Sequence, residues 1–220
     1  MRKVLLLVCV LSSLIVNAQW RLGLGGGASL NVYPHQDREL LFLSFLSEGN
    51  ISYQSISSWG VSTSVYGQYD FNKHFGVRAD LNWIQKNIYR RIYAKDFDTY
   101  FKIKNDYVQL PIMATCGWHL GRIELYLNLG VYGSYWMSST MSSNMDFADY
   151  KGINSEYDNR FDYGLVGGGG IGYYISDRFS VQIETQCFYS TVSTKKEING
   201  IKYPRYNTTF VIQPTICYVF

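Results

Sequence analysis

Apolar and polar residues alternate with a period of two along most of the chain. Clear examples are "WGVSTSVYGQYDF" at 59–71 and "RIELYLNLGVYGSYW" at 122–136, where one set of alternate positions is mostly aliphatic or aromatic and the other is small, polar or charged. Successive side chains of a strand point to opposite faces, so this pattern predicts β-strands. Eight strands are expected, at 20–33, 59–71, 75–93, 100–118, 122–136, 161–175, 178–194 and 203–220.

The connections between these segments alternate in length. Short turns are expected at 72–74, 119–122 and 176–177. Short turns at one rim and long loops at the other are typical of a meander closed on itself. The prediction is therefore an all-β fold, an eight-stranded antiparallel up-and-down β-barrel. Its long polar connections are expected at 34–58, 94–99, 137–160 and 195–202.

The first 18 residues have the features of a secretory signal peptide. Arg2 and Lys3 precede an apolar run at 4–16, and Val16-Asn17-Ala18 offers small or apolar residues at the cleavage positions. The run is shorter than the roughly 20 residues that a spanning helix needs, which disfavours a membrane anchor. We expect a signal peptide at 1–18 and a single barrel domain at 19–220.

The last hairpin permits a prediction of register. Asn199-Gly200 is a preferred dipeptide of a two-residue type I′ turn, and pairing about it makes partner numbers sum to 399. The two apolar faces then coincide, whereas a slip of one residue would put them on opposite faces. The expected pairs are Tyr189 with Phe210, Cys187 with Ile212, Ile183 with Ile216 and Phe179 with Phe220.

Two architectures fit such strands: a membrane barrel with its apolar face outward, or a soluble lipocalin-like carrier with that face inward. The polar face carries charges that would be costly against lipid. Aromatic residues gather at two levels, as at the two interfaces of a bilayer. They are Trp20, Phe71, Phe75, Trp118, Tyr173, Phe179, Tyr218 and Phe220 beside the short turns, and Trp59, Tyr135, Trp136, Phe161, Tyr189 and Phe210 about ten residues away. Together with the leader, this favours a transmembrane barrel of the bacterial outer membrane, with periplasmic termini and extracellular loops.

The chain's ending, "TICYVF", resembles the C-terminal assembly signal of outer-membrane barrels, with Tyr218 and Phe220 as its aromatic residues. More broadly the chain resembles the PorT-type outer-membrane β-barrel family of Gram-negative bacteria. The similar stretches are "WRLGLGGGASLNVY", "YVQLPIMATCGW", "FDYGLVGGGGIGYYISDRFSVQIE" and the final strand. The resemblance implies a transient partner, the barrel assembly machinery, and allows an accessory role in surface export.

The net charge and the motifs of the chain limit the classes of function that the sequence supports. Without the leader, 18 basic and 17 acidic residues remain, a formal charge of about +1, which gives no basis for a nucleic-acid partner. No Gly-x-Ser-x-Gly motif is present, and His35 with Asp37 is the one suggestive pair. We therefore predict a non-enzymatic protein without a cofactor, and an outer-membrane lipid-modifying enzyme remains the alternative.

Inward charges predict a sealed barrel rather than a conducting pathway, because side chains fill an eight-stranded barrel. Pairing about Ser176-Asp177 would set Gly168 opposite Glu184 and Gly170 opposite Gln182, small residues against large ones. The expected interior network consists of Arg78, Asp80, Glu124, Asp162 and Glu184.

What remains for function is the loop surface. The stretch "NIYRRIYAKDFDTYFKIKN" and the last hairpin run longer than the roughly 10 residues needed to cross a bilayer, so we expect them to project outside. Aromatic and basic residues there suit lipopolysaccharide headgroups or an extracellular protein partner. We predict a structural, adhesive or surface-interaction role. The candidate binding residues of the last hairpin are Lys195, Lys196, Lys202, Tyr203 and Arg205.

Overall fold

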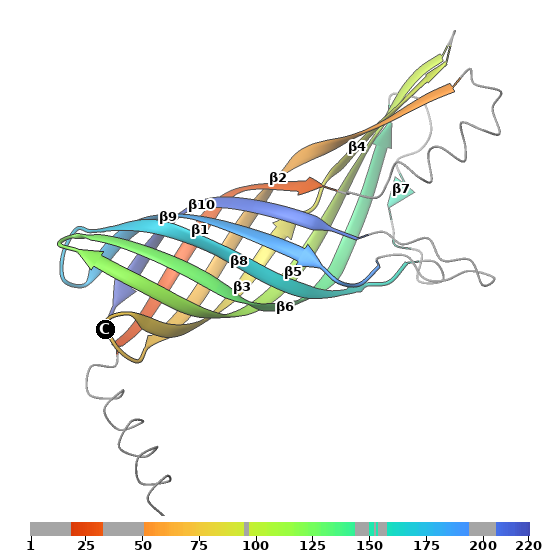
Figure 1. The fold of residues 1–220 in the computed structure, drawn as a ribbon. Coiled ribbons are helices and arrows are strands. Elements are labelled where there is room, and N and C mark those ends of the chain that lie inside the picture. The colour runs from red at the N-terminus through yellow and green to blue at the C-terminus, as the bar shows by residue number, and fades with distance from the viewer. Residues whose placement is uncertain are drawn as a thin grey trace, which may run out of the picture.

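The computed structural model describes residues 19–32, 51–94, 97–143, 150–151, 153, 158–193 and 206–220. Within these ranges, ten strands form one antiparallel sheet (Figure 1). No helix in the described ranges is long and apolar enough to cross a membrane. The strands are β1 (Gln19–Val32), β2 (Ile51–Asp70), β3 (Phe75–Gln85), β4 (Ile88–Ala94), β5 (Phe97–Leu120), β6 (Ile123–Ser143), β7 (Tyr150–Lys151), β8 (Phe161–Tyr174), β9 (Phe179–Ser190) and β10 (Thr208–Val219).

The sheet closes into a ring of eight strands. The first and last strands pair, with Arg21 opposite Val219, and this pairing seals the barrel. β3 and β4 both lie between β2 and β5 and count as one barrel strand, interrupted at Lys86 and Asn87. The two residues of β7 only pair with the end of β6, beyond its pairing with β8, and add no strand to the ring. The predicted eight-stranded antiparallel barrel is therefore confirmed.

One end of the barrel carries the short turns. They span 71–74, 121–122 and 175–178, and the C-terminus lies at the same end, here called the short-turn rim (Figure 1). The tightest of these turns needs Gly121, whose φ of 64° is in the left-handed region that glycine adopts without steric cost.

Burial follows the sequence alternation, with the apolar face outward. On β9, Val181 and Ile183 are exposed while Gln182 and Glu184 are buried. A soluble carrier would bury the aliphatic row and leave the charged row in water. The lipocalin-like alternative is therefore wrong.

The predicted register of the last hairpin is wrong by two residues. Partner numbers sum to 397, so Cys187 lies opposite Phe210 and Phe179 opposite Tyr218. A shift of two residues leaves every side chain on its predicted face, which is why alternation could not detect it. The turn residues Asn199 and Gly200 lie outside the described part of the chain.

The glycine pairs of β8 and β9 differ in the same way. Gly168 lies opposite Gln186 and Gly170 opposite Glu184, two residues from the predicted partners. The amides of Ile175 and Ser176 both donate to the carbonyl of Phe179, which centres the turn one residue later than predicted. When the centre of a turn moves by one residue along the chain, each residue's partner on the opposite strand changes by two.

One residue of the predicted aromatic levels faces the wrong way. Trp136 is 8% exposed and stacks inside on Tyr107, with ring centroids 5.8 Å apart. Trp136 continues the inward row of Tyr132 and Ser134. Tyr107 pairs with Trp136 and Asp106 with Ser138, so Met137 has no partner on β5 and forms a bulge at which the inward row ends. Ten of the other predicted aromatic residues are largely exposed. They are Trp20, Phe75, Trp118, Tyr173, Phe179 and Phe220 at the level of the short turns, and Trp59, Phe161, Tyr189 and Phe210 at the second level.

Four strands continue past the others at the end opposite the short-turn rim. Ile51 pairs with Ala94, and Phe101 pairs with Ser143, beyond the ends of β1, β8, β9 and β10. This extension, called the projecting sheet, consists of residues 51–58, 88–94, 97–105 and 138–143 and rises away from the ring in Figure 1.

Candidate functional site

Among the described residues, eight buried charged side chains form three clusters at three levels of the barrel interior. They are named the rim cluster, at the short-turn rim, the central cluster, and the upper cluster, beneath the projecting sheet. The levels follow from the order of residues along the inward rows of the strands.

In the rim cluster, Arg21 of β1 bridges two carboxylates. Its Nη1 donates to both oxygens of Glu124, at 2.8 and 2.7 Å, and its Nε pairs with Asp70. The Tyr174 hydroxyl donates to the same Glu124 at 2.9 Å, and His119 Nε2 lies 3.4 Å from it. One cation thus pairs with two buried acids, and the Tyr174 hydroxyl gives Glu124 a further, neutral donor.

The central cluster has the same composition around Arg78 of β3. Its Nε and Nη2 donate to the two oxygens of Asp80, at 2.7 and 3.0 Å, and its Nη1 lies 2.9 Å from Glu184. The guanidinium also sits 3.7 Å from the centre of the Tyr66 ring, a cation–π contact. Gln186 Nε2 donates to both carboxylates, at 3.1 and 2.7 Å.

The upper cluster is a pair, Lys86 and Asp162, joined at 2.8 Å. Ser190 Oγ donates to this carboxylate at 2.5 Å, and the Tyr132 hydroxyl at 3.3 Å. The Lys86 ammonium lies 4.5 Å from the centre of the Tyr107 ring. Because Lys86 occupies the interruption between β3 and β4, the pair anchors the base of the projecting sheet to the barrel wall.

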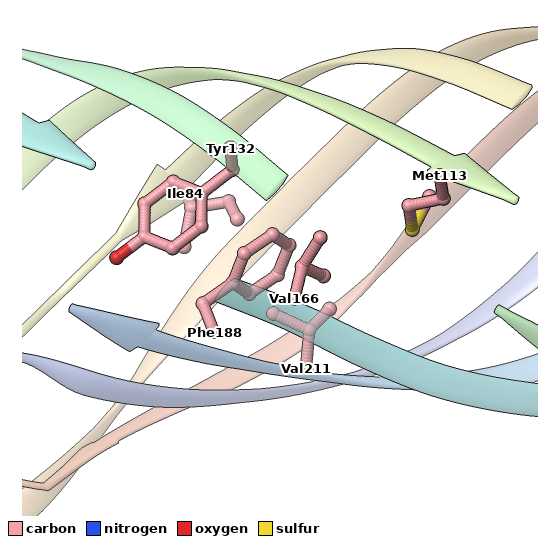
Figure 2. Packing of buried hydrophobic residues seen from close by; sticks show 6 residues of the cluster. All are labelled: Ile84, Met113, Tyr132, Val166, Phe188 and Val211. Atoms are coloured by element: carbon pink, nitrogen blue, oxygen red, sulfur yellow. The ribbon is translucent and has the colours of Figure 1, made fainter. Parts of the chain in front are cut away.

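An apolar layer crosses the lumen between the central and upper clusters. Along the inward row of β9, Phe188 follows Gln186 and precedes Ser190, so the apolar side chain separates the two polar levels. Figure 2 shows the side chains of this layer converging on the lumen from different strands, and the Phe188 ring meets that of Tyr132 edge-on at 5.3 Å. The layer consists of Ile84, Met113, Tyr132, Val166, Phe188 and Val211.

Inward glycines make room for the largest of these side chains. A Cβ at Gly23 would lie 2.1 Å from the Tyr66 ring, and one at Gly170 would lie 2.5 Å from the Tyr126 hydroxyl. The two tyrosines fill that space and both donate to Gln182, at 3.1 Å each. Small residues beside large ones are how a barrel of this size fills its interior.

The structure divides the predicted interior network. Arg78, Asp80 and Glu184 meet in the central cluster, whereas Glu124 belongs to the rim cluster and Asp162 to the upper one. Alternation shows that a residue points inward but not at which level, so the single network was wrong in its grouping.

Three charged members of these clusters, Arg21, Asp70 and Lys86, were missing from the predicted network. Asp70 stands in the inward row of its strand, but next to a turn, where an acid is usually solvated. Lys86 lies in "WIQKNIY", where alternation breaks: Ile84, Lys86, Asn87 and Ile88 are all buried. That local loss of alternation was the available signal for an interruption in the strand.

Other predicted residues stand apart from this interior. Tyr218 and Phe220 lie at the short-turn rim, with ring centroids 4.9 Å apart, and the amide of Phe220 donates to Trp20 at 2.9 Å. Lys195, Lys196, Lys202, Tyr203 and Arg205 lie outside the described residues, as do His35 and Asp37.

The described histidines are both near the short-turn rim. His74 Nδ1 is 2.9 Å from the carbonyl of Gly117, and His119 belongs to the rim cluster. No group of three metal-ligating side chains occurs within the described ranges. The geometry of the described interior is that of a filled, ion-paired core.

Comparisons with known proteins agree with this architecture. The family model described as "Outer membrane protein beta-barrel domain" matches residues 16–186. The crystal structure of Neisserial surface protein A is similar at 10% identity, covering 92% of this chain and 98% of that one, with a TM-score of 0.51. OprG, an outer membrane protein of Pseudomonas aeruginosa, is similar at 12% identity over 92% and 96% of the two chains, with a TM-score of 0.53. No curated protein matches. At these identities the two structures show the fold alone.

Proposed function

Because the chain belongs to the outer membrane protein beta-barrel domain family, we propose that it is a non-enzymatic surface protein whose barrel serves as a membrane anchor. In this proposal the projecting sheet and long loops lie outside the cell, the termini lie in the periplasm, and the projecting sheet binds an extracellular partner. The observation that carries the proposal is the filled interior: three ion-paired clusters and an apolar layer occupy the space that a channel would need.

The projecting sheet has the surface chemistry of a binding face. The rings of Tyr89 and Tyr100 stack with centroids 5.6 Å apart, and Tyr100 is exposed. Lys102 and Lys104 follow on the same face of β5 and are also exposed. Tyrosine and lysine on an extended strand offer aromatic contact and charge to a protein or glycan. The solved structure of similar fold that is itself named a surface protein supports the proposal only by analogy.

The test uses intact cells that produce the full chain. In single-cysteine variants, a membrane-impermeant maleimide should label Lys102→Cys in the projecting sheet and leave Lys73→Cys, in the short turn, unlabelled. Cells carrying Tyr100→Ser, Lys102→Ser and Lys104→Ser together should lose adhesion to an array of purified extracellular proteins and glycans.

The matched control changes the neighbouring strand of the same sheet. Thr140 and Ser142 are the β6 partners of Lys104 and Lys102, so Thr140→Ala with Ser142→Ala keeps the sheet and the basic row. Adhesion equal to wild type in the triple serine variant would refute the binding face, and labelling of Lys73→Cys alone would reverse the orientation.

The resemblance to PorT-type proteins supports a narrower version, an accessory role in surface export. In that case deleting the protein should leave the cell's surface-exported proteins in the periplasm, and re-expression should restore them to the surface. Unchanged export in the deletion strain would leave the adhesive role as the proposal.

A further inference from the structure

The outward wall of the barrel contains a groove near the base of the projecting sheet. It crosses β5, β6 and β8, is open on its outer side and has a volume of about 800 Å³. Its sides are outward-facing apolar residues, and along β5 it extends from Ile112 to Val108, about 13 Å at the usual strand rise. The apolar side chains along it are Val108, Leu110, Ile112, Val131, Phe161 and Leu165.

An outward glycine forms the open part of this groove. Gly133 of β6 lies between Val131 and Tyr135, and a Cβ built on it would meet nothing within 4 Å. On a wall otherwise covered by large side chains, the missing side chain leaves a recess with apolar sides. Within a bilayer such a recess is filled by hydrocarbon rather than by water.

Basic groups lie at the end of the groove that is nearer the projecting sheet. Arg160 precedes the groove residue Phe161, and its Nη1 donates to the hydroxyl of Tyr135, another groove residue, at 3.3 Å. On β5, Lys104 and Lys102 continue the outward row of Leu110 and Val108 and are exposed. The acid on this row, Asp106, already accepts hydrogen bonds from Gln85 at 3.1 Å and Ser138 at 2.7 Å.

We propose that this groove is a binding site for one lipopolysaccharide molecule, with an acyl chain of its lipid A in the recess at Gly133 and the phosphates of its headgroup at Arg160 and Lys104. An apolar recess that ends in cations matches a lipid with a phosphorylated head. The cations lie on β5 and just before β8, which suits a wide headgroup with more than one anionic group better than a single phosphodiester. Arginine suits the phosphate because its planar donors can bind two oxygens at once.

The test measures binding of purified lipid A to the full barrel in non-ionic detergent, by native mass spectrometry. Wild type should retain one lipid A. Gly133→Leu should weaken binding about tenfold or more, since excluding even two methylene groups from an apolar site costs roughly that factor. Arg160→Gln with Lys104→Gln should weaken it by a similar factor through the headgroup alone.

Gly67→Leu is the matched control. Gly67 is also an outward glycine with room for a side chain, since its Cβ would meet only Leu22 at 3.9 Å, but it lies on β2, away from the groove. Binding by this variant should equal wild type. Faster gel migration of unboiled samples should show that all variants retain the barrel.

Three results would overturn the site. They are equal weakening by Gly67→Leu and Gly133→Leu, equal affinity for phosphatidylcholine, which would indicate unspecific hydrocarbon contact, and equal affinity for phosphatidylglycerol, which would indicate any anionic lipid. Because detergent removes the sidedness of the membrane, these results are independent of the adhesion experiment.

Discussion

The barrel body and the projecting sheet are made from the same strands but obey different rules. On β6, exposed and buried residues alternate almost without exception from Ile123 to Trp136, and every residue from Met137 onward is exposed or half-buried. Below Met137 one face meets the lipid and the other a filled core, whereas above it the strand leaves the ring. Alternation therefore reports two different environments on the two faces of a strand, and ends where that difference ends.

The barrel body and the projecting sheet also differ in where their polar side chains lie. In the barrel body, polar side chains are buried and are joined across strands far apart in sequence, as Arg21 is to Glu124 and Arg78 to Glu184. In the projecting sheet, lysines are exposed to solvent. Stability should thus depend on the body, and binding on the projection.

The largest expected effect is from Arg78→Ala in the central cluster. The side chain is 1% exposed, and its loss leaves Asp80 and Glu184 buried without their cation. Removing one partner of a buried ion pair typically costs about 3–5 kcal/mol. Urea unfolding in detergent should show this loss, while Arg122→Ala, in an exposed turn, should leave the midpoint unchanged. Equal midpoints for the two variants would mean that the central cluster does not stabilise the barrel.

Phe188→Ala should have a somewhat smaller effect, because it opens a cavity but strands no charge. Truncating a buried phenylalanine costs about 3 kcal/mol at the lower end of the usual range. In planar bilayers neither wild type nor this variant should form a stable large pore, since the ion-paired clusters on either side of the layer remain. Reproducible porin-like steps from wild type would contradict the sealed interior.

The smallest effect on stability should come from the projecting sheet. Combined replacement of Tyr100, Lys102 and Lys104 by serine should change the free energy of unfolding by no more than about 0.5 kcal/mol per site, as is usual for exposed positions. The same protein should have lost adhesion. A large drop in the urea midpoint would show that the projecting sheet is part of the folded core rather than an accessory to it.

Strands, turns and faces could be predicted because they are local properties. Period-two alternation identified all eight barrel strands and the outward face of Val181 and Ile183, and the short turns were found from their length and composition. The site was predicted less completely. Five charges of the interior network were predicted, but Arg21, Asp70 and Lys86 were missed. The grouping was not predicted either, because partners such as Lys86 and Asp162 are 76 residues apart and meet only after the ring closes.

The sequence by itself determined which side chains face the lipid and which face the lumen, since that choice depends only on parity along each strand. Tertiary structure alone decided the register, which differs by two residues in the last hairpin, because a two-residue shift changes no face and costs nothing that alternation can detect. It also decided which charges pair, how Phe188 and its neighbours cross the lumen, and where Gly133 leaves a recess. These depend on the relative heights of strands, and closure of the ring between β1 and β10 sets those heights.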